Sequence, residues 1–241
     1  MKKNIIIILI QLFDFFYKLK ILNFLKKKNK KYDIFFDVGA HHGESIDFFL
    51  KNFKIKKIFS FEPSPINFNV LEKKYLFFRN KFKNSSIFIE NLGISNEVKK
   101  KTLKQFPESS SSTFNEINSN SIYYKKKSAI LYGKAHRNFF SRINVKTTTL
   151  HGYLSKNGIK SINFLKIDTE GYEYKVLLGL KKYISRVHLI MFEHHYDNMI
   201  IKNYNFSDIN SLLVKNKFKQ ILKLKMPFRK TFEYIYENSR F

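Results

Sequence analysis

The stretch from residue 35 to residue 45, FFDVGAHHGES, constrains the fold of this chain more than any other. Apolar residues that favour strands lead into it, and Gly39, Ala40 and Gly43 follow at spacings that suit a tight turn opening into a helix. A strand, a glycine turn and a helix in this order place backbone N–H groups at the carboxyl end of a buried strand, where doubly wound sheets bind ligands. The stretch therefore predicts a ligand-binding turn in an α/β domain.

The spacing of this turn differs from the dinucleotide fingerprint G-x-G-x-x-G, because it reads D-x-G-A-x-x-G and carries Asp37 before the first glycine. A second strand, predicted over residues 57–61, is followed by Glu62, at about the place where such sites position an acid for ribose hydroxyls. An acid beside the turn suits a cationic ligand better than a pyrophosphate. The alternative for Asp37 is a capping residue in a purely structural turn.

A third segment, INFLKIDTEGYEYKVLLGL at residues 162–180, makes the pattern more specific. Together with DVGAHHG and FEPSP, it resembles the FkbM family of S-adenosylmethionine-dependent methyltransferases, over about residues 32–195. The resemblance implies S-adenosylmethionine (SAM) as the cofactor and a class I methyltransferase-like, Rossmann-like fold. It does not indicate the substrate.

The predicted cofactor site combines the turn, the second strand and the end of the third strand. The turn would hold the methionyl end of the cofactor, the acid after the second strand would bind the ribose, and by family analogy the end of the third strand would border the adenine. Residues at strand ends can also be simple turn formers. The predicted cofactor-binding residues are Asp37, Gly39, Ala40, His41, Gly43, Glu62, Pro63, Ser64, Asn91, Leu92 and Gly93.

The catalytic candidates are four polar residues near the ends of two predicted strands. Lys166, Asp168 and Glu170 lie at the end of strand 162–167, and Glu193 follows strand 187–192. Asp168 directly follows a buried strand, so it could orient an acceptor hydroxyl or act as a general base. Glu170 could equally be a favourable charge in the first turn of a helix. Lys166 could be a buried partner for these acids rather than a catalyst.

A histidine pair, His194 and His195, follows Glu193. Either histidine could serve as a base, or as a metal ligand together with Asp168. A histidine pair at a strand end is more often polar surface, and we expect no metal.

Strands alternate with helices along the chain, which predicts an α/β, doubly wound, mostly parallel sheet with helices on both faces. Five residues separate the last two predicted strands, 218–224 and 230–236, which is too few for a crossover helix. We therefore expect an antiparallel C-terminal hairpin. The remaining predicted strands are 86–90, 97–106, 143–150 and 187–192, and the predicted helices are 44–52, 65–78, a short one ending at 156, 170–183 and 207–215.

We expect an N-terminal amphipathic helix with a basic end over residues 1–31. We expect a methyltransferase domain over residues 32–241. The apolar run at residues 5–10 is too short for a membrane span, and no small-residue cleavage site follows it. The helix could rest on an anionic membrane surface or pack on the catalytic domain, and we favour packing. Its expected apolar face comprises Leu12, Phe15, Phe16, Leu19, Leu22 and either Phe24 or Leu25.

The Ser- and Asn-rich segment 107–138 is the least regular part of the sequence. In the family that the chain resembles, the corresponding region lies over the active site and varies with the acceptor. We therefore expect a variable, substrate-side loop here. The alternative is a mobile insertion without a role.

Forty-five Lys and Arg residues against 19 Asp and Glu residues give a net charge of +26. Such a charge would attract nucleic acid, anionic lipid or acidic polysaccharide, although a codon bias of the genome would produce the same excess. Cysteine is absent, which excludes disulfides and thiolate chemistry.

The predicted function is O-methylation of a hydroxyl group, with a sugar or surface glycan as the expected acceptor. The alternatives are methylation of a nucleic acid, or a non-catalytic polyanion- or membrane-surface-binding protein on the same fold. We expect a cytoplasmic protein, with peripheral contact to the membrane through the N-terminal helix as the alternative.

Overall fold

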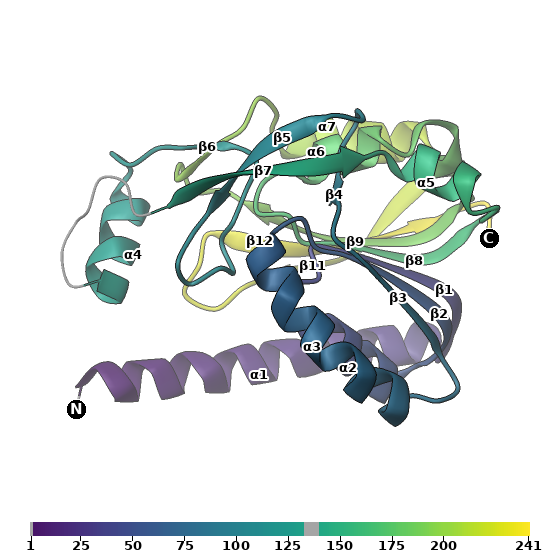
Figure 1. Cartoon of the computed structure of the whole chain (residues 1–241), viewed down its shortest axis with the longest axis horizontal. Helices are drawn as coiled ribbons and strands as arrows, with labels where there is room; N and C mark the ends of the chain where they lie inside the picture. Colours follow the sequence, from purple (N-terminus) through teal and green to yellow (C-terminus); the bar gives the residue numbers. More distant parts are fainter. Residues whose placement is uncertain (1, 133–139) are drawn as a thin grey trace.

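The computed structural model describes residues 2–132 and 140–241, and its centre is a sheet of seven strands within these ranges (Figure 1). The order of the strands across the sheet differs from their order in the chain. It is β11 (Phe218–Lys225), β12 (Thr231–Asn238), β9 (Val187–His195), β8 (Ile162–Ile167), β1 (Lys31–Val38), β2 (Lys54–Phe61) and β3 (Ser86–Glu90).

Five neighbouring strands, from β9 to β3, run parallel, and β12 runs antiparallel to both β9 and β11. The predicted doubly wound sheet and its C-terminal hairpin are therefore confirmed. The hairpin turns back into the sheet, so the antiparallel strand is second from the edge and β11 forms the edge.

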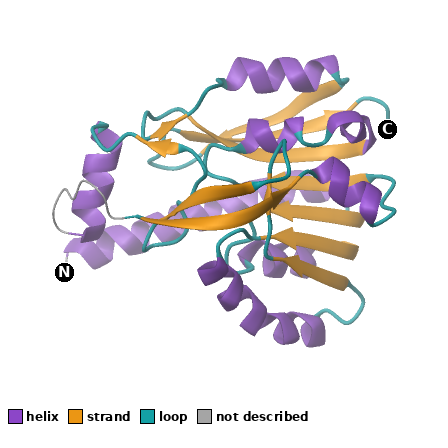
Figure 2. Cartoon of the chain, turned by 45° about the horizontal axis from the view of Figure 1, so that its top comes forward, coloured by secondary structure: helices purple, strands orange, loops and turns teal. Residues whose placement is uncertain are grey.

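Helices cover both faces of this sheet (Figures 1 and 2). One face packs against α1 (Lys2–Lys28), α2 (Glu44–Asn52) and α3 (Pro65–Lys81), and the other against α5 (Leu150–Lys156), α6 (Glu173–Leu178), a 3₁₀ helix (Lys181–Arg186) and α7 (Phe206–Lys215). Successive side chains of a strand point to opposite faces, so Phe35 of β1 joins the first layer and Phe36 the second. Burial on both faces explains the nearly continuous apolar sequence of these strands.

A smaller layer of strands stands over the carboxyl ends of the central sheet. β7 (Ser141–Thr148) pairs with β5 (Lys100–Gln105) and with β4 (Gly93–Ile94), and β6 (Glu116–Ile117) pairs with β10 (Ile200–Ile201). The prediction of an irregular segment at 107–138 was wrong in part, because this segment contains β6 and the helix α4 (Ile122–Tyr132). Residues 133–138 lie outside the described residues.

The helix predicted over residues 170–183 was too long. Glu170 and Gly171 have φ angles of +49° and +87°, so the chain is still in a turn there and α6 begins only at Glu173. A Cβ atom on Gly179 would lie 2.2 Å from the backbone oxygen of Ser95, so the chain passes very close to another segment at this point. The polypeptide continues as a 3₁₀ helix after this contact.

The N-terminal helix packs on the domain, as expected. Its buried residues, Tyr17, Ile21, Leu22 and Leu25, belong to the same apolar cluster as α2 and α3. The predicted apolar face was wrong at Phe15 and Phe16, which are exposed, and the side chain of Leu12 lies outside the described residues. Among the helices of the described chain, none combines the length and the apolar character needed to cross a bilayer. The division at residue 31 stays a prediction.

Candidate active site

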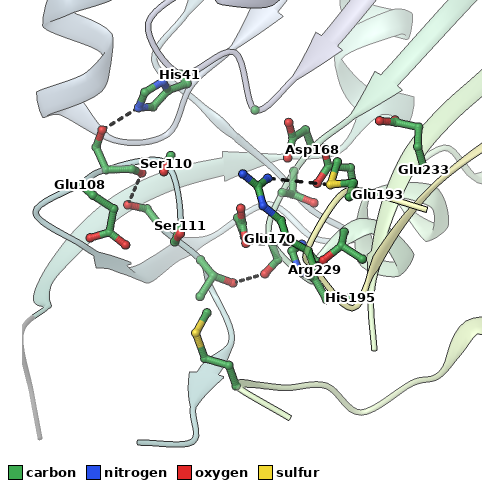
Figure 3. A pocket seen from close by; sticks show the side chains of 18 of the residues that line it. His41, Glu108, Ser110, Ser111, Asp168, Glu170, Glu193, His195, Arg229 and Glu233 are labelled. Carbon is green, nitrogen blue, oxygen red and sulfur yellow. Dashed lines mark hydrogen bonds and ion pairs between the residues drawn. The ribbon is translucent and has the colours of Figure 1, made fainter. Parts of the chain in front are cut away.

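A cavity of about 1400 Å³ opens at the carboxyl ends of β1, β2, β8 and β9 (Figure 3). The Ser-rich segment and α4 line one side of it, and α1 with the loop between β11 and β12 line another. The described part of the segment, residues 107–132, therefore contributes to the cavity wall. Its part in substrate choice stays a prediction.

The glycine turn after β1 forms part of the cavity wall. The N–H groups of Gly39 and Ala40 both donate to the backbone oxygen of Phe61, at 3.0 Å each, which joins the turn to the end of β2. Gly39 has a φ of +87°, and a Cβ atom there would lie 1.8 Å from the backbone oxygen of Asp168. Only glycine allows β1 and the chain after β8 to approach this closely.

Glu62 is held rigidly at the tip of β2. Its Oε2 accepts the N–H of His41 at 2.8 Å, and its Oε1 accepts the N–H of Ser64 at 3.0 Å and the side-chain amide of Asn67 at 3.3 Å. Burial raises the pKa of Glu62, while these donors oppose the rise. The carboxylate thus ties the turn to the start of α3 and lines the cavity.

Six of the eleven predicted cofactor-binding residues line the cavity: Gly39, Ala40, His41, Glu62, Pro63 and Leu92. The other five lie behind or beside the wall in the described structure. Gly43 begins α2, where a Cβ atom would meet Phe78 at 2.7 Å, so the residue serves helix packing. Ser64 caps α3 by accepting the N–H of Asn67.

Asn91 and Gly93 also stand off the cavity in this structure. The exposed Asn91 side chain donates to the backbone oxygens of Glu62 and Pro63, at 2.8 and 3.2 Å, and so fixes the loop after β2. A Cβ atom on Gly93 would meet the ring of Phe114 at 2.7 Å. Both residues therefore shape the neighbourhood of the site from outside it.

Asp37, the fifth of these residues, lies fully buried beneath the wall. Its Oδ1 is 3.4 Å from the ammonium of Lys166, which is also 3.3 Å from Oδ2 of Asp168. Burial raises the pKa of Asp37 to about 6, although Lys166 opposes the rise. Burial lowers the pKa of Lys166, but Asp168 and Asp37 outweigh it and raise the value overall. Lys166 is therefore the buried partner of two acids, one of the two roles considered for it.

The predicted catalytic residues come together, since Lys166, Asp168, Glu170 and Glu193 all line the cavity. The register of the sheet adds a further acid, because Glu233 of β12 lies opposite Glu193 of β9. Burial and the charge of Asp168 raise the pKa of Glu193 well above its usual range and that of Glu233 to about 7.

The hydroxyl of Tyr17 on α1 donates to Oε2 of Glu233 at 3.4 Å, so the N-terminal helix reaches this acidic pair. Sequence reasoning missed both Tyr17 and Glu233. Each lies outside the recognised motifs, and the strand register that brings Glu233 to Glu193 is a feature of the folded hairpin.

The two histidines at the end of β9 point to different places. His195 lines the cavity, with Nε2 at 3.4 Å from Oε2 of Glu170 and Nδ1 at 3.8 Å from Oδ2 of Asp197. Burial lowers its pKa, but Glu170 and Asp197 outweigh this and raise the value to about 9. His194 instead packs among aromatic rings, and burial lowers its pKa to about 3.

The described residues do not bring Asp168 and the histidine pair together as metal ligands. The donor atoms that do cluster, within 4.8 Å of one another, belong to His41, His42 and Glu44. Nδ1 of His41 is 3.3 Å from Oε2 of Glu44, which also accepts the N–H of His42 at 3.1 Å. These contacts already account for the cluster as hydrogen bonding around the start of α2.

The family model of the methyltransferase FkbM domain matches residues 37–220. The chain belongs to the FkbM methyltransferase family. No curated protein matches it. Among solved structures, methyltransferase FkbM from Methylobacillus flagellatus KT is 17% identical, with a TM-score of 0.54 over 85% of this chain and 43% of that one. The chain therefore spans less than half of that protein's length.

A second similar structure is magnesium protoporphyrin IX methyltransferase from Synechocystis PCC 6803 with bound SAM. It is 7% identical, with a TM-score of 0.52 over 95% of this chain and 79% of that chain. At these identities the likeness shows the class I methyltransferase fold. The family supports methyltransferase function, and the fold prediction is confirmed.

The cavity of this FkbM-family chain is acidic although the chain as a whole is basic. Among the described residues, the cavity wall carries nine of the 19 acidic residues of the sequence. They are Asp14, Glu44, Glu62, Glu108, Asp168, Glu170, Glu193, Asp197 and Glu233. The same wall carries six Lys and Arg residues within the described ranges, so acids outnumber cations there, whereas cations predominate in the chain as a whole.

Proposed function

We propose that the chain is a SAM-dependent O-methyltransferase that acts on a hydroxyl group of a sugar or surface glycan. The observation that carries this proposal is the shared cavity. The backbone turn after β1, the fixed carboxylate of Glu62 and a group of buried acids meet there, at the carboxyl ends of the parallel strands.

The residues of the turn and of β2 fit SAM better than they fit a dinucleotide. SAM supplies a methyl group on a cationic sulfonium. Gly39 and Ala40 leave room beside the backbone, and Glu62 presents a carboxylate at the tip of β2, where a ribose would be bound. A carboxylate such as that of Asp168 favours the positive charge of the cofactor, whereas it would repel a pyrophosphate.

The acceptor side of the cavity suits hydroxyl groups. Asp168 stands at the end of β8, where it could orient an acceptor hydroxyl and receive its proton. Glu193 and Glu233 hold protons more tightly than ordinary carboxyl groups because burial and Asp168 raise their pKa values, so they can donate as well as accept hydrogen bonds. Alignment of sulfonium and oxygen in one cavity would be the main contribution of the protein.

Calorimetric titration with SAM tests the cofactor assignment. We expect binding by the wild type and a weaker affinity for Glu62→Gln. Glu72→Gln is the matched control, because Glu72 is an exposed acid on α3 and should leave the affinity unchanged. Absence of SAM binding by the folded wild type would leave only the non-catalytic alternative.

A methyl-transfer screen with labelled SAM against glycans, lipids and RNA tests the acceptor class. We expect label in hydroxyl-bearing glycans and loss of transfer in Asp168→Asn while SAM still binds. Transfer to RNA alone would contradict the acceptor class but not the cofactor.

A further inference from the structure

Four phenylalanine rings form an exposed apolar patch on α1 and on the loop between β11 and β12. The exposed fractions are 44% for Phe13, 55% for Phe15, 52% for Phe16 and 71% for Phe228. Phe228 contacts Phe13 and Phe15 contacts Phe16, with ring centroids 5.1 and 5.8 Å apart. Phe13 and Phe16 are neighbours on the helix surface, so the four rings form one phenylalanine patch. Such a gathering of exposed rings marks an interaction surface.

On α1, Phe15 and Phe16 lie on the side away from the cavity, whereas Phe228 of the phenylalanine patch belongs to the cavity wall. Tyr17 and Ile21 are buried and line the cavity, together with Asp14. With 3.6 residues per turn, Phe15 and Phe16 point away from these residues. One side of the helix therefore belongs to the candidate active site and the other faces solvent.

Basic residues lie close in sequence to the rings of the phenylalanine patch, and two of them, Lys18 and Lys230, also line the cavity. Lys18 and Lys20 are exposed on α1, and Lys225 and Lys230 are exposed on either side of the loop that carries Phe228. The acid closest in sequence, Asp14, is paired with Arg229 at 3.3 Å. Apolar rings with cations around them match the interfacial region of a bilayer that contains anionic lipids.

The helix also continues away from the domain. Its first turns extend beyond the central sheet, at the left of Figure 1, and their sequence, KKNIIIILI from Lys2, is apolar after a basic start. Because no described helix can span a membrane, such a segment fits a position along the surface rather than across it.

We infer that α1 and the loop carrying Phe228 dock on the surface of an anionic lipid bilayer through the phenylalanine patch. In this orientation the bilayer lies beside the part of the cavity wall that contains Phe228 and Lys230. An acceptor attached to lipid would enter the cavity from the side of this loop, and this last step rests on the proposed function. A partner protein or a second copy of the chain fits less well, because the rim of the patch carries cations.

Sedimentation with vesicles tests the docking. The wild type should sediment with vesicles of phosphatidylcholine and phosphatidylglycerol, and much less with phosphatidylcholine alone or at high salt. Phe15→Ser/Phe16→Ser should weaken vesicle binding at least about tenfold. The control is Leu76→Ser/Phe77→Ser, which removes an equally exposed apolar pair from α3 and should bind like the wild type.

The absence of cysteine allows a second, positional measurement. An environment-sensitive dye on Phe15→Cys should shift its emission to the blue on anionic vesicles, and the same dye on Leu76→Cys should not. SAM titration of each variant shows separately whether the domain is folded and binds cofactor.

Three results would overturn the inference. The wild-type protein could stay in the supernatant with anionic vesicles at low salt, or the Phe15→Ser/Phe16→Ser variant could sediment like the wild type. Alternatively, the wild type could be a dimer and the Phe15→Ser/Phe16→Ser variant a monomer, with vesicle binding the same for both. None of these results bears on SAM binding, so the proposed function can stand or fall independently.

Discussion

Replacement of Glu62 by glutamine removes one charge from a carboxylate whose two oxygens hold different parts of the site. Oε2 accepts the N–H of His41, while Oε1 accepts the N–H of Ser64 and the amide of Asn67. Glutamine has a single oxygen, so its NH₂ group must face a backbone N–H on one side. Either the turn after β1 or the start of α3 then loses its acceptor.

The expected loss follows from the value of a hydrogen bond to a charged group, about 1.5–3 kcal/mol. If this loss falls on ribose binding and on the order of the turn, the dissociation constant for SAM rises roughly tenfold to 150-fold, since about 1.4 kcal/mol is a factor of ten. The melting temperature should fall by about 3 °C or more, at roughly 2–4 °C per kcal/mol for a domain of this size. Burial raises the pKa of Glu62, which shows that its charge is costly to bury. The neutral glutamine avoids part of this cost, so the fall in melting temperature should be about 3 °C, the lower value above.

Calorimetry with SAM and thermal unfolding of the same samples measure both quantities, with Glu72→Gln as the control. A Glu62→Gln variant that melts lower but binds SAM within twofold of the wild type would show that Glu62 only supports the turn. Unchanged affinity together with unchanged melting would refute the reasoning altogether.

Three further substitutions test other parts of the site. Gly39→Ala should abolish SAM binding and lower the yield of folded protein because the added Cβ overlaps the chain after β8. The control is Gly158→Ala, at a position with a φ of +63° and no atom within 4 Å of the added Cβ, which should lower the free energy of unfolding in urea by only about 1–2 kcal/mol. Lys166→Met should lower the free energy of unfolding by about 3–5 kcal/mol because it leaves the buried carboxylate of Asp37 without its cation. In a double-mutant cycle, the addition of Asp37→Asn should restore part of this loss. Burial and Asp168 raise the folded-state pKa of Glu233 from its ordinary value of 4.5 to about 7, so its contribution to the free energy of unfolding is complete below pH 4.5 and is lost as the pH rises to 7. Glu233→Gln should remove that part of the pH dependence of the free energy of unfolding, measured by urea unfolding at several pH values, and an unchanged pH dependence would contradict the raised pKa.

The sequence was sufficient for those parts of the fold that depend on local pattern. The strand and turn at residues 35–45 predicted β1, the turn and α2, and the short spacing after β11 predicted the C-terminal hairpin. Residues that directly follow buried parallel strands, such as Glu62 and Asp168, could also be placed, because such strands end at one edge of a sheet.

Features that depend on tertiary contacts could not be predicted in the same way. The outward position of Phe15 and Phe16 is set by which side of α1 the domain covers. Glu233 reaches the cavity through its register with Glu193, and Asp37 points under the wall because Lys166 of the neighbouring strand lies there. Glu170 looked like the start of a helix, but the positive φ angles at this residue and at Gly171 keep it in the turn beside His195.

The two sides of the cavity have different origins in the chain. The turn after β1 and Glu62 lie within residues 37–220, which match the family, whereas Tyr17 on α1, Glu233 on β12 and the loop carrying Phe228 lie outside that range. Because Asp168 and Glu193 of the proposed acceptor side lie within the matched range and Glu233 lies outside it, the family match covers the proposed cofactor turn and only part of the proposed acceptor side. The same α1 that contributes Tyr17 to the cavity wall carries Phe15 and Phe16 on its other side. We therefore expect changes on the inner side of α1 to alter the acceptor and changes on its outer side to alter membrane contact, with SAM affinity unaffected by either.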